Sequence, residues 1–339
     1  MGFQFDGNGF NRFIQSVDGT YEVYAPVRFK DGGIHANSDM IRYQQIRDIE
    51  DVVFDEKSAF SFKEVVLPIM QTLFYFNEDQ IREPNFKEKG AIVLLRHCDM
   101  HALKRLDTIY LKNGPEDHYY KQVRKRIKFA VMGCQTSFEN CFCVSMDANV
   151  SDIYDFSIDL RDGFYYCDVK DENLQQQLKR FAKQTLDIIS DHVLENDIRV
   201  HIPKDLSARV AFSSIWDEYD TRCIACGRCN FVCPTCTCTT TQDIFYQDNA
   251  RVGERKRVWA SCMVDGFSEV AGGGSCRKKH GERMRFKVLH KVLDYKQRFD
   301  AHMCTGCGRC DDVCPEYISF SNAINKLEGA MKELAQNEK

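Results

Sequence analysis

The sequence predicts a fold of two domains, an α/β domain over residues 1–200 followed by a mainly α-helical domain over residues 201–339. Two observations lead to this prediction. In the first part, short apolar runs typical of buried strands alternate with helical patterns, whereas after His201–Pro203 strand patterns become rare and cysteines and basic residues accumulate. A chain of 339 residues with 43% hydrophobic residues is also long enough to form two separate cores.

Several elements of the N-terminal domain can be placed from hydrophobic patterns. The runs Ala91–Leu95 and Lys128–Met132 predict two buried strands, and a helical pattern follows the first of them. Tyr154–Leu160 and Phe164–Val169 alternate around a glycine turn and predict a hairpin. Leu174–Leu194 is expected to be one long helix with a polar face.

Composition limits the classes of protein to which the chain can belong. No apolar run approaches the ~20 residues of a membrane span, and the N-terminus lacks the basic start and apolar core of a signal peptide. We therefore expect a cytoplasmic protein without membrane insertion. The net charge of -4 argues against a partner that is a nucleic acid. In such a chain, 17 cysteines that fall mostly in clusters indicate metal binding rather than disulfides.

The spacing C-x2-C-x2-C-x3-C-P occurs twice in the C-terminal domain and is typical of bacterial ferredoxins with two 4Fe–4S clusters. In those proteins the fourth cysteine of each run ligates the cluster of the other run. The predicted ligands of the first cluster are Cys223, Cys226, Cys229 and Cys314. Those of the second are Cys304, Cys307, Cys310 and Cys233. Paired zinc knuckles are the alternative, but zinc sites usually have two separated cysteine pairs rather than a triplet with a trailing Cys-Pro.

A third set of cysteines lies in the N-terminal domain. Cys98 and Cys134 each follow a predicted strand, and if these strands are parallel neighbours, both thiols lie at the sheet edge where α/β folds bind ligands. Cys141 and Cys143 come soon enough afterwards to fold back on Cys134. Together the four could ligate a third 4Fe–4S cluster. Ordinary buried cysteines are the alternative interpretation.

Five cysteines remain outside these sets: Cys167, Cys236, Cys238, Cys262 and Cys276. Cys167 lies in a strand pattern and is expected in the core. Cys236 and Cys238 directly follow the Cys-Pro step of the first run and are expected to be structural or spare ligands. The sequence indicates no role for the other two.

No motif for a substrate site accompanies the cysteines. No dinucleotide-binding G-x-G-x-x-G follows a strand, and no cysteine set is left for a sirohaem, so no catalytic residue is assigned. The segment 277–298 has nine Lys and Arg residues and two acidic ones. Such a segment is either a solvated helix face or a docking surface for a redox partner.

In combination, motifs spread over residues 96–315 resemble the iron–sulfur subunit of anaerobic sulfite reductase, and the related beta subunits of soluble sulfhydrogenases share much of the pattern. The motifs are Arg96-His97-Cys98-Asp99, Cys141-Phe142-Cys143, Cys233-Pro234-Thr235-Cys236, Trp259-Ala260-Ser261-Cys262 and the segment 283–291. The sulfhydrogenase relatives usually have proline where this chain has His97. That difference favours the sulfite reductase branch and makes His97 an alternative ligand.

The resemblance implies a complex in which a flavin subunit oxidises NADH, this chain relays electrons through its 4Fe–4S clusters, and a sirohaem subunit reduces sulfite to sulfide. It also favours the third cluster, because the same four cysteines recur in the pattern. Three alternatives remain open. The chain could be the electron-relay beta subunit of a cytoplasmic sulfhydrogenase, an enzyme that uses the N-terminal cluster catalytically, or a zinc-stabilised interaction module.

Overall fold

A computed structural model describes residues 1–33, 37–246 and 251–336, and within it the chain forms two compact units. The first unit contains Met1–Phe138, Asn149–Leu194 and Thr241–Val258, and the second contains Glu139–Ala148, Glu195–Thr240 and Trp259–Lys339. Each unit is thus built from segments that are separated in sequence. The sequence predicted one continuous stretch per domain, and that division at residue 200 stays a prediction.

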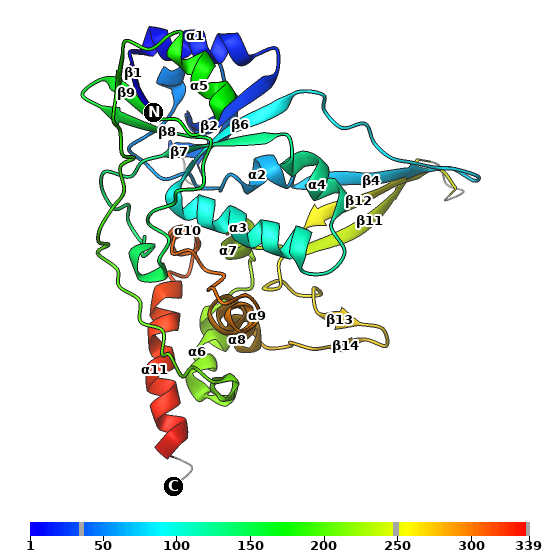
Figure 1. Ribbon diagram of the computed structural model, residues 1–339. Coiled ribbons are helices and arrows are strands. Elements are labelled where there is room, and N and C mark those ends of the chain that lie inside the picture. The colour runs from blue at the N-terminus through cyan, green and yellow to red at the C-terminus, as the bar shows by residue number, and fades with distance from the viewer. Residues whose placement is uncertain (34–36, 247–250, 337–339) are drawn as a thin grey trace. The chain divides into compact units, whose positions relative to one another are not determined.

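The first unit is organised around an eight-stranded sheet with the strand order β10-β1-β9-β8-β7-β6-β2-β3 (Figure 1). Its strands are β1 (Gly2–Phe5), β2 (Tyr21–Phe29), β3 (Met40–Ile46), β6 (Gly90–Arg96), β7 (Ile127–Met132), β8 (Phe156–Arg161), β9 (Phe164–Asp168) and β10 (Gln184–Leu186). The four central strands β2, β6, β7 and β8 run parallel, and the outer strands pair antiparallel. The predicted strands at Ala91–Leu95 and Lys128–Met132 are confirmed as β6 and β7, and the predicted hairpin is confirmed as β8 and β9.

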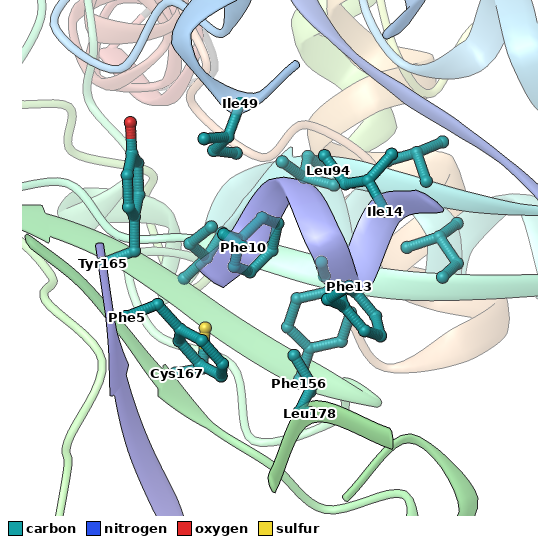
Figure 2. Close-up of a cluster of buried hydrophobic side chains, with 14 of the residues drawn as sticks. Phe5, Phe10, Phe13, Ile14, Ile49, Leu94, Phe156, Tyr165, Cys167 and Leu178 are labelled. Carbon is teal, nitrogen blue, oxygen red and sulfur yellow. The ribbon is translucent and has the colours of Figure 1, made fainter. Parts of the chain in front are cut away.

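Helices cover both faces of this sheet. They are α1 (Gly7–Val17), α2 (Lys63–Val66), α3 (His97–Lys112), α4 (His118–Arg124), α5 (Glu172–Lys179) and the 3-10 turn η1 (Ile49–Asp51). Successive residues of a strand point to opposite faces, so Leu94 packs under α1 and α5 while Val93 packs under α2, α3 and α4. In the first of these cores the rings of Phe10 and Phe13 lie 5.4 Å apart (Figure 2). Cys167 is fully buried there, so its predicted place in the core is confirmed.

The long helix expected over Leu174–Leu194 is wrong. Helix α5 ends at Lys179, and the chain then forms β10 against β1, with Gly2 opposite Leu186. Lys183 donates its backbone N–H to Gln4 at 2.8 Å. The open edge of β1 offers main-chain partners to this segment, and pairing in the sheet overrides a helical pattern that is weak in isolation.

A second, four-stranded sheet has the order β11-β12-β4-β5. Its strands are β4 (Met70–Phe76), β5 (Ile81–Arg82), β11 (Thr239–Phe245) and β12 (Gly253–Trp259). The pairing of β12 with β4 is antiparallel and shifts register between Arg255 and Lys256. Strands from residues 70–82 and from residues 239–259 therefore share one sheet, an arrangement that the sequence did not predict.

The second unit consists of short helices joined by long irregular segments. Its helices are α6 (Glu218–Arg222), α7 (Arg228–Phe231), α8 (His280–Leu289), the π-helical turn η5 (His290–Asp294), α9 (Tyr295–Phe299), α10 (Arg309–Asp312) and α11 (Phe320–Gln336). It also has the 3-10 turns η2 (Val144–Met146), η3 (Ala208–Phe212) and η4 (Ser214–Trp216), and the two-stranded hairpin β13 (Glu269–Val270) and β14 (Gly274–Ser275). The expectation of a mainly α-helical domain is therefore not confirmed. None of the described helices has the length and apolar character of a membrane span.

Candidate iron–sulfur sites

The first ferredoxin run is built around the short helix α7. Cys223 follows the last residue of α6, and Cys229 lies in the first turn of α7. Between them Gly227 has a φ of 75°, in the left-handed region that favours glycine. A Cβ at this position would lie 2.8 Å from the Val264 side chain. Glycine in the C-x2-C-x2-C loop is therefore required both by the backbone conformation and by close packing.

The second ferredoxin run repeats this arrangement around α10. Gly306 and Gly308 have φ values of 67° and 71°. A Cβ on Gly306 would lie 2.5 Å from the backbone of Phe142, and one on Gly308 would lie 2.2 Å from the carbonyl oxygen of Asn140. The loop of the second run is thus packed directly on the segment that contains Cys141 and Cys143. Helices α7 and α10 also contact each other, which brings the two runs side by side.

Two adjacent cavities collect the eight cysteines of the runs. The first cavity is lined by Cys223, Cys226, Cys229 and Cys314. The second is lined by Cys233, Cys304, Cys307 and Cys310. Cys229 also faces the second cavity, and Cys310 also faces the first. Each cavity is thus lined by five of the eight cysteines, with Cys314 facing only the first of the two and Cys233 only the second, and the two predicted ligand sets stay a prediction.

Two buried lysines lie against the sulfur atoms. Lys287 and Lys291 are each about 5% exposed. Burial opposes the charge on Lys287, but the thiols of Cys229 and Cys310 outweigh burial and raise the pKa of the lysine. Burial likewise opposes the charge on Lys291, and Cys233 and its neighbours raise the pKa of this lysine. A buried ammonium needs an anionic partner. Cysteine thiolates that hold a metal cluster provide one.

These lysines correct the expectation for the segment 277–298. Its basic residues were expected on a solvated face or a docking surface, yet Arg283, Lys287 and Lys291 are buried on α8 and η5. The ammonium of Lys291 donates to the hydroxyl of Thr235 at 2.8 Å. Sequence spacing held a signal that was missed, because Arg283, Lys287 and Lys291 recur every four residues and so share one helix face.

A buried hydroxyl without a hydrogen-bond partner is evidence that the second cavity holds a bound group. Thr305 is buried and lines this cavity. Its Oγ1 has no hydrogen-bond partner in the part of the chain that the structure describes. Because buried polar atoms in native proteins nearly always have a partner, the hydroxyl is placed to donate to an acceptor inside the cavity. The sulfur atoms of a 4Fe–4S cluster are such acceptors, so the residues present fit the group that the motif implies.

The four cysteines of the third set are divided between the two units, with Cys98 and Cys134 in the first and Cys141 and Cys143 in the second. In the first unit, Arg96 of β6 lies opposite Met132 of β7 in a parallel pairing, so Cys98 and Cys134 follow the same edge of the sheet, as expected. In the second unit, the thiol of Cys141 donates to the carbonyl oxygen of Cys307 at 3.5 Å. Convergence of the two pairs on one cluster stays a prediction.

His97, the alternative ligand, is fully engaged in hydrogen bonds. Its Nδ1 accepts from the backbone N–H of Ser151 at 3.0 Å, which leaves Nε2 to donate to the carbonyl oxygen of Asp191 at 3.1 Å. Burial lowers the pKa of His97 to about 4. The imidazole is therefore neutral and has no nitrogen available for a metal, and its role is to join the start of α3 to the segments before β8 and after β10.

Comparisons with known proteins agree with these sites. Residues 222–318 match the family model for a 4Fe-4S dicluster domain. The chain is also 27% identical over 340 residues to a Pyrococcus furiosus protein named sulfhydrogenase 2 subunit beta, across 94% of this chain and 96% of that relative. This chain contains a 4Fe-4S dicluster domain. Along nearly its whole length it is related to the sulfhydrogenase beta subunit, and no solved structure matches it.

Proposed function

We propose that the chain is the electron-relay beta subunit of a sulfhydrogenase-type complex. The observation that carries this proposal is that both units, rather than the ferredoxin-like part alone, are related to a sulfhydrogenase beta subunit. The sequence argument for the sulfite reductase branch depended on His97 in place of proline. Since His97 is occupied by two hydrogen bonds within the first unit, that argument weakens. The sulfite reductase subunit is the second candidate, supported by the motifs quoted above.

In this proposal the chain's own residues hold two one-electron carriers and form the electron path between them. A bound 4Fe–4S cluster supplies a centre that accepts and releases one electron at a time. Cys229, Cys310, Lys287 and Phe320 line both cavities. These shared side chains support a short path between the two carriers. Thr305 supplies a hydrogen bond to the second cluster, and Lys287 supplies a positive charge beside both clusters.

The third set would extend this path. Cys141 hydrogen-bonds to the backbone of Cys307, a proposed ligand of the second cluster. If Cys98, Cys134, Cys141 and Cys143 hold a third cluster, the path leads from the ferredoxin-like part toward the sheet of the first unit. We propose that the two ends of the path exchange electrons with different partners in a cytoplasmic complex, one with a flavin subunit, the other with a hydrogen-activating subunit. For the second candidate, a sirohaem subunit takes the latter place.

The test is purification of the native complex under anaerobic conditions. We expect the chain to co-purify with a hydrogen-activating subunit, which should enable the complex to reduce a viologen dye with hydrogen. Co-purification with a sirohaem subunit, together with NADH-dependent sulfite reduction, would replace the proposal with the second candidate. Iron and acid-labile sulfide should approach about 12 per chain with three clusters or about 8 with two. A colourless protein that contains zinc and no iron would contradict both candidates.

A further inference from the structure

Three cysteines outside the proposed ligand sets lie together in the second unit. Cys236 and Cys238 are in the loop before β11, and Cys262 is in the loop after β12. Ala260 donates its backbone N–H to the carbonyl oxygen of Cys238 at 2.9 Å and so ties the two loops together. The thiol of Cys238 hydrogen-bonds with both Cys236 and Cys262. Cys238 is therefore in contact with both of the other sulfur atoms.

The surroundings favour reactivity over inert packing. The side-chain amide of the buried Asn230 donates to Cys262 Sγ at 3.1 Å. Hydrogen bonds from Cys238 and from Asn230 lower the pKa of Cys262 to about 7, whereas hydrogen bonds with Cys236 and Cys262 raise the pKa of Cys238. The buried ammonium of Lys291 lies close enough to Cys236 and Cys238 for their charges to interact. One thiol of the pair is thus stabilised as a thiolate and the other as its hydrogen-bond donor.

Access differs among the three sulfur atoms. Cys236 and Cys262 are buried, while Cys238 is only partly buried. A reagent from solvent therefore meets Cys238 first, with the other two sulfur atoms behind it. A dithiol couple needs one accessible sulfur to form the mixed disulfide with the reagent and a second sulfur beside it to resolve that mixed disulfide.

We propose that Cys238 and Cys262 form a redox-active dithiol–disulfide couple that exchanges with low-molecular-weight disulfides. Cys238 passes its proton along the hydrogen bond to Cys262 and attacks one sulfur of the external disulfide as a thiolate, and the first small thiolate leaves. Cys262 gives that proton to the departing small thiolate, attacks Cys238 Sγ, forms the bond between the two cysteines and releases the second small thiolate. The protein loses two electrons and one proton, and the external disulfide becomes one small thiol and one small thiolate. Cys236, the third sulfur, takes no part in the couple.

The experiment uses the full chain purified anaerobically, with its iron content measured before and after treatment. The protein is incubated with oxidised glutathione, alkylated, digested and examined by mass spectrometry. We expect one linked peptide pair that joins Cys238 to Cys262, with iron content unchanged. Cys262→Ser should abolish that pair, and Cys236→Ser should retain it. Exposed Cys276 should appear as a glutathione adduct and serves as the control for reagent activity.

Three outcomes overturn the couple. One is glutathione on Cys276 with no link between Cys238 and Cys262 in the wild-type chain. Another is a link that persists in Cys262→Ser through Cys236 at the wild-type level. The third is a stoichiometric metal that is lost in Cys238→Ser while the ferredoxin runs keep their iron, since the three thiols would then be ligands. None of these outcomes tests the proposed relay function. That function is contradicted by a different result, the absence of iron from the untreated protein.

Discussion

The two ferredoxin runs have the same cysteine spacing, yet the fold encloses them differently. Around the first, Cys226 is exposed, and its neighbours Ile224 and Tyr317 are 55% and 89% exposed. Around the second, Cys307 is only 7% exposed, and the segment 140–143 packs on the loop. The motif therefore specifies the ligands but not the access to them. We expect the first site to exchange electrons with a partner protein and the second to pass them within the chain.

The electrostatic surroundings differ as well. Lys287 lines both cavities, whereas Lys291 and Thr305 line the second alone. Positive charge and hydrogen bonds to sulfur favour the reduced, more negative form of a cluster, while burial in a medium of low dielectric constant opposes it. The second site combines strong burial with two compensating ammonium groups. These opposing terms can keep the potentials of the two sites close, as a relay requires.

The largest expected effect concerns the crossed fourth ligands. Cys233→Ser should remove the same cluster as Cys304→Ser, and Cys314→Ser the same cluster as Cys226→Ser, with a loss of about four irons per chain in each case. The remaining electron paramagnetic resonance signal identifies which cluster is left. If Cys233→Ser instead gives the spectrum of Cys226→Ser, each run holds its own fourth cysteine. Cys167→Ser is the control, because this buried thiol lies in the core of the first unit and should leave the iron content unchanged.

The next effect tests the packing that encloses the second site. In Gly306→Ala, the added Cβ meets the backbone of Phe142 at 2.5 Å, and alanine must adopt a φ of 67°. We expect a destabilisation of about 2–4 kcal/mol, which sums the strain of a left-handed residue and an overpacked contact. Thermal unfolding of the iron-loaded chain measures it. Gly272→Ala is the matched control, because Gly272 has a φ of 89° but no neighbour within 4 Å. Equal losses in both variants would mean that packing on Phe142 contributes nothing.

Features that depend on residues close together in the sequence could be predicted, whereas features that depend on contacts between distant residues could not. Cysteine spacing and the Gly-containing loops are local, so the two cysteine runs could be identified from the motif, while their division into two ligand sets stays a prediction. The parallel strands β6 and β7 were also predictable, since both are short apolar runs. The segment 139–148 was assigned to the N-terminal domain, but it packs in the second unit. That contact joins residues more than 160 positions apart, and no local pattern encodes it.

The errors have physical causes too. The helix expected over Leu174–Leu194 failed because main-chain pairing at the edge of β1 is non-local. The basic segment 277–298 was judged by its charge, and charged residues are normally exposed. Lys287 and Lys291 are buried because the cysteine sulfur atoms beside them are anionic when they hold a cluster, and a composition argument cannot supply that partner. The pairing of Cys238 with Cys262 depends on the contact between the loops before β11 and after β12.

A smaller effect distinguishes the two sites electrostatically. Lys287→Met should lower the midpoint potentials of both clusters, and Lys291→Met should lower that of the second cluster alone. Removal of one buried charge at this range corresponds to about 60–100 mV for a one-electron centre. Redox titration monitored by electron paramagnetic resonance gives the two potentials separately. Arg285→Met is the control, since Arg285 lies on the same helix but binds the Ala211 carbonyl and lines neither cavity. A shift of only one potential in Lys287→Met would contradict its place between the sites.

The smallest effect tests whether the first site is the one that meets a partner. Tyr317 follows its proposed ligand Cys314 by three residues and is almost fully exposed. Tyr317→Ala should change the stability of the isolated chain by no more than about 0.5 kcal/mol, as expected for a surface side chain. In the complex, an exposed tyrosine beside an electron-transfer site is a candidate anchor, and its loss should weaken partner binding about tenfold. Binding of the purified partner protein measures this, with Phe212→Ala as the control. Phe212 is similarly exposed, but only Tyr317 is flanked by residues that line the first cavity, Glu316 and Ile318. If Phe212→Ala weakens binding and Tyr317→Ala does not, the partner docks elsewhere, and exposure of the first site does not mark the exit of the electron path.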